Sequence, residues 1–174
     1  MEKKVLSESS IYIDEISKIS QIDNHQIKNH ILLNLLKDPS TNRHNDIQLT
    51  QHHQHITWVY EYIKDHFTLH EKNKTLALNE VIIKIDQQGQ TSIKRNHINK
   101  YDIFNSPNFT FLYPLCDNGE LIIEWENYKN KNQFVAIPLK EKKLIGWNSN
   151  LDYYLSPNEN EEFRIVLLFN CKFI

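Results

Sequence analysis

The chain has 174 residues, a formal net charge of −2 and a hydrophobic fraction of 40%. These values predict a folded chain with a substantial core rather than a disordered segment. They argue against an electrostatic nucleic-acid binder, which usually carries an excess of basic residues. Three glycines are present, whereas average usage of about 7% predicts roughly twelve. No two of them are close enough for a phosphate-binding or dinucleotide-binding loop, which excludes nucleotide binding of that kind.

Other features of the sequence bear on the cellular compartment and on whether the chain contains disulfides or a zinc site. No apolar run approaches the roughly 20 residues that a membrane span needs, and the polar start is unlike a secretion signal. Cys116 and Cys171 are too few for a disulfide framework or a zinc cluster. We therefore expect a soluble, cytoplasmic protein. Abundant Asn, Ile and Lys with few Ala, Gly and Arg are typical of AT-rich coding DNA, so most of this bias reflects the genome.

The first third of the sequence is predicted to be helical with polar joints. Residues 11–16 indicate a short edge strand that leads into the first helix. Asp23 is a suitable N-cap for that helix, and Asp38-Pro39 is a suitable stop. The polar stretch 39–55 predicts a loop, and a second helix follows it. The apolar residues with helical spacing are Ile27, Ile31, Leu32, Leu35 and Leu36 in the first helix and Ile56, Val59, Tyr60, Ile63 and Phe67 in the second.

From about residue 75 onward the hydrophobic period becomes strand-like. Short segments rich in β-branched and aromatic residues alternate with turns that contain Gly, Asn, Ser and Pro. Six or more short strands at regular spacing are typical of a sandwich or barrel. We predict one α+β domain over 1–174, with a helical flank (1–72) and a jelly-roll core (75–174). The predicted strands are 81–85, 109–113, 121–125, 134–137, 143–145 and 164–169.

The C-terminal half contains a sequence motif in addition to the strand-like hydrophobic periodicity. The motif comprises residues 143–158, 162–165 and 168–170, with segments 111–113 and 117–122 upstream. Together these segments resemble the 2-oxoglutarate/Fe(II)-dependent oxygenase superfamily, and most of all its small members common in marine bacteria and their phages. The resemblance implies a double-stranded β-helix, which is a jelly roll, and the cofactors Fe(II) and 2-oxoglutarate.

The resemblance also implies a cosubstrate site. In the family, an arginine on the last strand makes a bidentate, charge-assisted pair with the distal carboxylate of 2-oxoglutarate. Arg164 matches that arginine, and it is one of only three arginines in the chain. Tyr113, on the aromatic strand, is expected to line the same pocket.

The metal positions depart from the family. The family holds its metal with two histidines and a carboxylate or a third histidine. Counting from Gly89, the first ligand pair falls at Arg95 and His97, and the distal histidine falls at Tyr153. Only His97 is a usual ligand, and a guanidinium in the site would repel a cation. The candidate substitutes from elsewhere in the chain are Asp102 and His70.

Other clusters of chemically active residues are given plainer interpretations. We interpret His52-His53-Gln54-His55 as a solvated polar loop, His66 and His70 as surface residues of a helix, and Cys116 as a structural thiol. Lysines and aromatic residues between 128 and 143 are interpreted as a solvated hairpin, because glutamates dilute their charge.

Two principal functions remain open, and a small-molecule binding module would use the same pocket as either. One is an active 2-oxoglutarate-dependent hydroxylase with non-standard ligands. The other is a catalytically degenerate member of the fold that serves as a structural or interaction protein, with a phage or virion component as one form. We favour the second, because two ligand positions must be replaced for catalysis. Its expected partner is another protein or a second copy, and neither nucleic acid nor a membrane.

Overall fold

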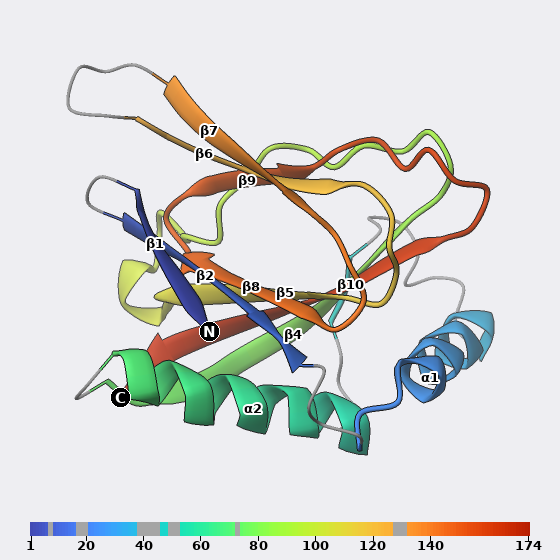
Figure 1. The fold of residues 1–174 in the computed structure, drawn as a ribbon, viewed down its shortest axis with the longest axis horizontal. Helices are drawn as coiled ribbons and strands as arrows, with labels where there is room; N and C mark the ends of the chain where they lie inside the picture. The colour runs from blue at the N-terminus through green and yellow to red at the C-terminus, as the bar shows by residue number, and fades with distance from the viewer. Residues whose placement is uncertain (7–8, 17–20, 38–45, 49–52, 72–73, 127–131) are drawn as a thin grey trace.

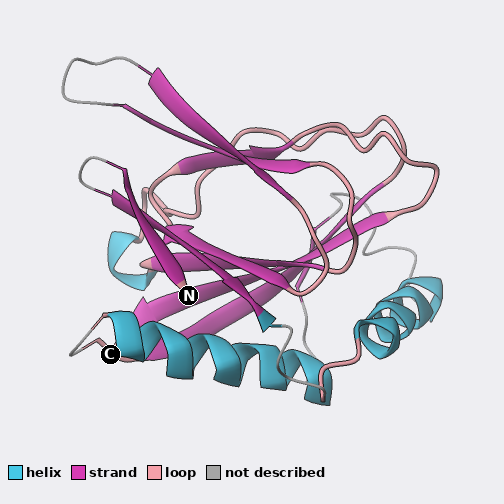
Figure 2. Ribbon diagram, viewed as in Figure 1, coloured by secondary structure: helices cyan, strands magenta, loops and turns pink. Residues whose placement is uncertain are grey.

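Two antiparallel sheets and two helices make up the fold (Figures 1 and 2). The computed structural model describes residues 1–6, 9–16, 21–37, 46–48, 53–71, 74–126 and 132–174. The strands are β1 (Glu2–Leu6), β2 (Ser9–Glu15), β3 (Asp46–Gln48), β4 (Leu76–Asp86), β5 (Phe109–Pro114), β6 (Glu120–Glu126), β7 (Asn132–Pro138), β8 (Lys143–Asn148), β9 (Asp152–Leu155) and β10 (Arg164–Phe173). The helices are α1 (Asn24–Lys37), α2 (Gln54–His70) and the short 3-10 turn η3 (Ile103–Asn105).

The two sheets face each other across the interior. The large sheet has the strand order β1-β2-β8-β5-β10-β4-β3, and the small sheet has the order β7-β6-β9. In Figure 1 the small sheet lies above the large one, and α2 runs along the lower, outer side of the large sheet. The arrangement is a jelly roll with helices on one side, which confirms the predicted α+β class and jelly-roll core.

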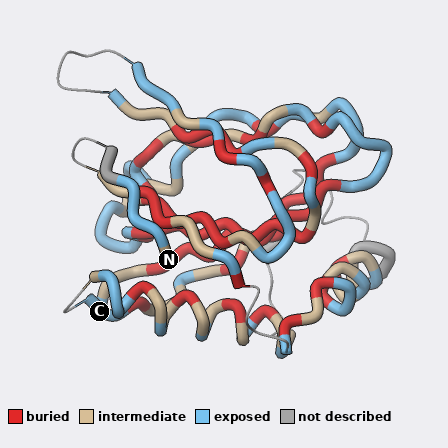
Figure 3. Tube along the Cα trace, in the orientation of Figure 1, coloured by how far each residue is buried: buried red, intermediate tan, exposed pale blue. Residues whose placement is uncertain are grey.

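Strand β10 is an inner strand of the large sheet, between β4 and β5. Because side chains alternate along a strand, its residues divide between two separate cores. Val166 and Leu168 point inward and pack in the core between the sheets, whereas Ile165 and Leu167 point outward and pack under the helices. Both faces are buried, as Figure 3 shows in red. A strand buried on both faces explains the continuous apolar run in this part of the sequence.

The helices are placed by their apolar faces. Asp23 caps α1 as predicted, since its carboxylate Oδ1 accepts hydrogen bonds from the backbone N–H groups of His25 and Gln26. The predicted second helix is also confirmed. Its buried residues Ile56, Val59, Ile63 and Phe67 share the outer core with Ile27 and Ile31 of α1. None of the described helices is both long enough and apolar enough to cross a membrane.

The N-terminal flank differs from the prediction in its strands, because the predicted edge strand is an inner one and two further strands are present. Residues 9–15 form an inner strand, β2, which pairs with β1 on one side and β8 on the other. Strand β1 takes the edge position, and its polar sequence gave no apolar alternation to reveal it. Strand β3 lies within the predicted loop 39–55 and pairs with β4. The predicted stop at Asp38-Pro39 lies outside the described residues.

Candidate functional site

The inward face of β10 is polar at its two ends and apolar between them. Arg164 and Asn170 are the polar ends, and the five residues of extended strand between them put their Cα atoms about 20 Å apart. Val166 and Leu168 lie between them and are fully buried. They pack against Leu112 and Trp147 in the inter-sheet core, so two separate polar clusters exist in the jelly-roll interior.

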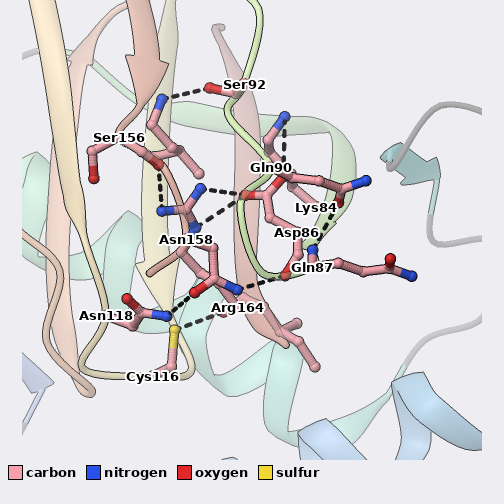
Figure 4. A network of polar contacts seen from close by, with 12 residues as sticks. Lys84, Asp86, Gln87, Gln90, Ser92, Cys116, Asn118, Ser156, Asn158 and Arg164 are labelled. Atoms are coloured by element: carbon pink, nitrogen blue, oxygen red, sulfur yellow. Dashed lines mark hydrogen bonds and ion pairs between the residues drawn. The ribbon is translucent and has the colours of Figure 1, made fainter. Parts of the chain in front are cut away.

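The first cluster is built around Arg164, whose side chain is fully buried (Figure 4). Its Nε and Nη2 donate to Asp86 Oδ2 over 3.0 and 2.7 Å, and its Nη1 donates to the Ser156 backbone carbonyl over 2.7 Å. Asp86 is the last residue of β4, where it pairs in register with Arg164 on β10. A buried carboxylate of the chain therefore already holds the predicted cosubstrate arginine.

Neighbouring polar residues support this ion pair. Lys84, on the same face of β4, places its Nζ 3.9 Å from Asp86 Oδ1. The Asn158 amide donates to the Asp86 backbone carbonyl over 2.9 Å, which ties the loop before β10 to the end of β4. Gly119 leaves space for the guanidinium, because a Cβ at this position would lie 2.6 Å from Arg164 Nη1. The backbone of Gly119 also has a φ of +83°, which favours glycine.

The second cluster joins His97 to the other end of β10. Asn170 accepts from the Thr110 hydroxyl through Oδ1 and donates to Glu80 Oε1 through Nδ2, over 2.9 Å in each case. These partners fix the orientation of the amide, so its Nδ2 donates to His97 Nδ1, 3.2 Å away. His97 consequently carries its proton on Nε2, which lies 2.7 Å from the Tyr153 hydroxyl and donates to it.

Arg95 and Tyr153 face each other across this cluster. Their backbones form a two-way bridge, with N–H to carbonyl distances of 3.0 and 2.8 Å. Arg95 Nε donates to the Tyr153 hydroxyl over 3.1 Å, and the guanidinium carbon is 5.8 Å from the centre of the phenol ring. The phenol oxygen of Tyr153 thus receives hydrogen bonds from both Arg95 and His97. The structure brings together the three residues that the sequence placed at the family's ligand positions.

Three other predicted site residues lie elsewhere. Tyr113 is on the outer face of the large sheet, where its hydroxyl donates to Asn24 Oδ1 over 2.8 Å and burial raises its pKa. Its predicted position beside Arg164 is therefore corrected, because odd-numbered residues of β5 point away from the interior. Asp102 caps η3 and accepts hydrogen bonds from the backbone and side-chain nitrogens of Asn105 over 3.2 and 2.7 Å. His70 ends α2, outside the large sheet.

His66 and Cys116 keep their plainer interpretations, whereas the histidine cluster at 52–55 does not. His66 stacks on Tyr62 and contacts its backbone carbonyl, within one helix. Cys116 is half-buried, and burial raises the pKa of its thiol, which disfavours the thiolate form. The predicted solvated loop at 52–55 is wrong where it is described, because His53 is the N-cap of α2, His55 lies in its first turn, and both contact α1. His52 and the lysine-rich residues 127–131 lie outside the described residues.

Asp86, Glu80 and Thr110 were not anticipated from the sequence. Asp86 ends an apolar strand, where a charged residue most simply indicates a strand end at the surface. Its partnership with Arg164 depends on the antiparallel pairing of two strands 78 residues apart. Among the described residues, no three His, Cys, Asp or Glu side chains converge as a metal site.

Comparison with solved structures identifies the fold. A viral collagen prolyl hydroxylase from Paramecium Bursaria Chlorella virus-1 matches with a TM-score of 0.66 and 13% identity, covering 92% of this chain and 94% of the other. The α-ketoglutarate-dependent carbocyclase SnoK from nogalamycin biosynthesis gives a TM-score of 0.66 and 9% identity, over 92% and 78% of the two chains. A prolyl hydroxylase from Trichoplax adhaerens gives 0.65 and 12%, over 92% and 82%.

The sequence itself matches no protein-family model and no curated protein. The similarity therefore lies in the arrangement of strands and helices, because sequence identities of 9–13% give no evidence of a shared activity. It extends over nine tenths of the chain in each of these three comparisons, including the helical flank. The chain has the double-stranded β-helix fold of the 2-oxoglutarate/Fe(II)-dependent oxygenases.

Proposed function

We propose that this chain is a non-catalytic protein with the oxygenase fold and that it acts as a structural or interaction component. The observation that carries the proposal is the buried ion pair between Asp86 and Arg164. Nε, Nη1 and Nη2 of Arg164 each have a partner within the chain. A 2-oxoglutarate carboxylate at this arginine would have to displace Asp86, which would leave a buried charge without its partner.

The residues around His97 do not fit Fe(II) either. The usual site needs two histidines and a carboxylate on one face of the metal. Here the other two ligand positions are Arg95 and Tyr153, and the Arg95 guanidinium brings a positive charge to the place where a cation would sit. The Nε2 of His97 faces the Tyr153 hydroxyl. These side chains therefore do not support metal-dependent catalysis at this position.

A virion or phage particle is the setting that we propose for this structural role. Two features support it, namely the viral source of the collagen prolyl hydroxylase with the same fold and the AT-rich type of composition. Purification of the particle from its producing cells provides the test. The chain should sediment with the particle and resist a salt wash that strips loosely bound proteins, and recovery of the chain only in the soluble fraction would contradict this setting.

Anaerobic titration tests the absence of catalysis. Fe(II) or Mn(II) and 2-oxoglutarate are added separately and together, and the melting temperature is followed. We expect no stabilisation from the metal and cosubstrate combination. Stabilisation that requires both and disappears in Arg164→Lys would show a working cosubstrate site and refute the proposal. Lysine keeps the positive charge beside Asp86 but loses the bidentate geometry, so this variant is less damaging to the fold than alanine.

A designed gain of function checks the assignment of the metal positions. The double substitution Arg95→His and Tyr153→His would place two further imidazoles beside His97. We expect this variant to bind Ni(II) or Mn(II), whereas the single variant Tyr153→His has one ligand fewer and should bind more weakly. Equal metal affinities of the double variant and the natural chain would show that these residues do not share one site.

A further inference from the structure

The loop between β4 and β5 presents three large apolar side chains to solvent. Tyr101 is 101% exposed, Phe104 is 98% exposed and Ile103 is 66% exposed. Scattered apolar residues on a surface need no explanation, but three within four positions on one loop are typical of a contact site. Tyrosine and other large apolar side chains are also frequent anchors at protein interfaces.

Hydrogen bonds hold this loop in one shape. Asp102 accepts from Asn105, and the Ser106 hydroxyl donates to the Asp102 carbonyl over 3.0 Å and accepts from the Asn99 backbone N–H over 2.8 Å. Lys172, at the end of β10, donates to Asn105 Oδ1 over 3.1 Å. A loop that is already ordered loses little conformational entropy when it binds, so its apolar side chains are ready anchors.

A concave apolar surface lies elsewhere on the same chain. The groove between α2 and β4 has a volume of about 440 Å³. The Tyr60 hydroxyl donates to the Leu76 carbonyl over 3.1 Å and accepts from the Leu78 N–H over 3.0 Å, which fixes the spacing between the helix and the strand. The apolar lining is provided by Ile56, Tyr60, Leu78, Val81 and Phe169.

The two surfaces also differ in charge in a complementary way. Glu61 and Glu80 are among the residues that line the groove. Lysines flank the loop, since Lys100 precedes Tyr101 and is exposed, and Lys172 bonds Asn105. The loop carries one carboxylate of its own, Asp102, which is engaged in capping. Glu61 is already ion-paired with Lys64 of the same helix, so Glu80 is the carboxylate that the groove offers to the lysines beside the apolar anchors.

The loop does not fill the groove of its own chain, because the side chains of Tyr101 and Phe104 are fully exposed. We propose that the 99–106 loop of one copy docks into the α2–β4 groove of a second copy. The contact is head-to-tail, so each copy retains one free loop and one free groove, and the copies add in series. This inference rests on the proposed structural function and names its partner.

Two surface substitutions separate the two halves of the contact. Phe104→Glu removes the loop anchor, and Thr57→Arg fills the groove from an exposed position on α2. Because both side chains are exposed, neither change disturbs the core, and circular dichroism verifies the fold. Sedimentation velocity is measured from about 1 µM to about 1 mM, the range in which weak interfaces associate. The natural chain should form dimers and larger species as its concentration rises.

Mixing the variants gives the decisive result. Each variant alone should remain monomeric, whereas an equimolar mixture should form dimers and nothing larger, because only one intact loop and one intact groove remain per pair. Monomers at all concentrations of the natural chain would overturn the proposal. Association that Thr57→Arg leaves unchanged would also overturn it, because it would indicate a loop-to-loop contact. Binding of the chain to anionic vesicles without self-association would overturn it as well. None of these outcomes depends on metal or 2-oxoglutarate, so failure here is distinct from failure of the non-catalytic assignment.

Discussion

The Asp86 carboxylate and the Arg164 guanidinium are cross-strand neighbours, with Asp86 Oδ2 2.7 Å from Arg164 Nη2 and both side chains at most 1% exposed. Two charges at this depth stabilise the fold only as a pair, because each has lost its hydration. The pair joins the end of β4 to the start of β10, a long inner strand of the large sheet. Its integrity is therefore a condition for folding as well as the basis of the functional proposal.

Removing one member of this pair should be severely destabilising. We expect Asp86→Ala to lower the free energy of unfolding by about 3–5 kcal/mol, because Arg164 then remains charged and buried without its carboxylate. Urea denaturation measures the loss. The double variant Asp86→Leu with Arg164→Met should recover much of it, since both charges are then absent. Glu159→Gln, an exposed change nearby, serves as the control, and an equal loss in that variant would show that the effect is not specific to the pair.

Tyr153 should be more important for stability than its neighbour Tyr154. Tyr153→Phe removes the oxygen that accepts from both His97 and Arg95, which should cost about 1–3 kcal/mol. Tyr154 lies on the opposite, partly exposed face of β9, so Tyr154→Phe should change stability by no more than about 0.5 kcal/mol. Ring nitrogen shifts in NMR spectra should show His97 protonated at Nε2. A proton on Nδ1 instead would contradict the proposed hydrogen-bond direction.

Acid should destabilise the contact between α1 and α2. Burial and the nearby His30 and His55 lower the pKa of His53, whose ring centre is 4.5 Å from that of His30. The unfolded chain then takes up its proton at a higher pH, close to the ordinary value of about 6.5, than the folded chain does. The stabilisation is present above that value and is lost as the pH falls through it toward the lower folded-state pKa. Urea unfolding at several pH values should show a smaller decline in His53→Gln, and equal declines would contradict this origin.

The sequence predicted those parts of the fold that are determined by local pattern. The face of α2, the Asp23 cap and the apolar strand β10 all carry their signal within a few residues, so they could be recognised. Strand β1 could not, because its polar residues show no apolar alternation. The role of Asp86 could not either, because its partner Arg164 is 78 residues away in the chain. Tyr113 was misplaced for a related reason. An apolar strand buried on both faces does not reveal which of its residues point toward the interior.

Gly119 should be required for Arg164 to take its observed position. Both Gly119 and Gly89 have positive φ angles, +83° and +76°, so alanine strains the backbone at either position. Only at Gly119 would the added Cβ also meet neighbours, at 2.6 Å from Arg164 Nη1 and 2.9 Å from Ser156 Oγ, whereas nothing lies within 4 Å at Gly89. We expect Gly89→Ala to cost about 1 kcal/mol and Gly119→Ala to cost a further 1–3 kcal/mol or so from the clash. In the background of Asp86→Leu with Arg164→Met, where the guanidinium is gone, the difference in cost between the two alanine substitutions should shrink but not vanish, because Ser156 Oγ remains close to the added Cβ. Urea denaturation measures both costs. An undiminished difference in this background would place the cause in the turn and Ser156 rather than in the space around Arg164.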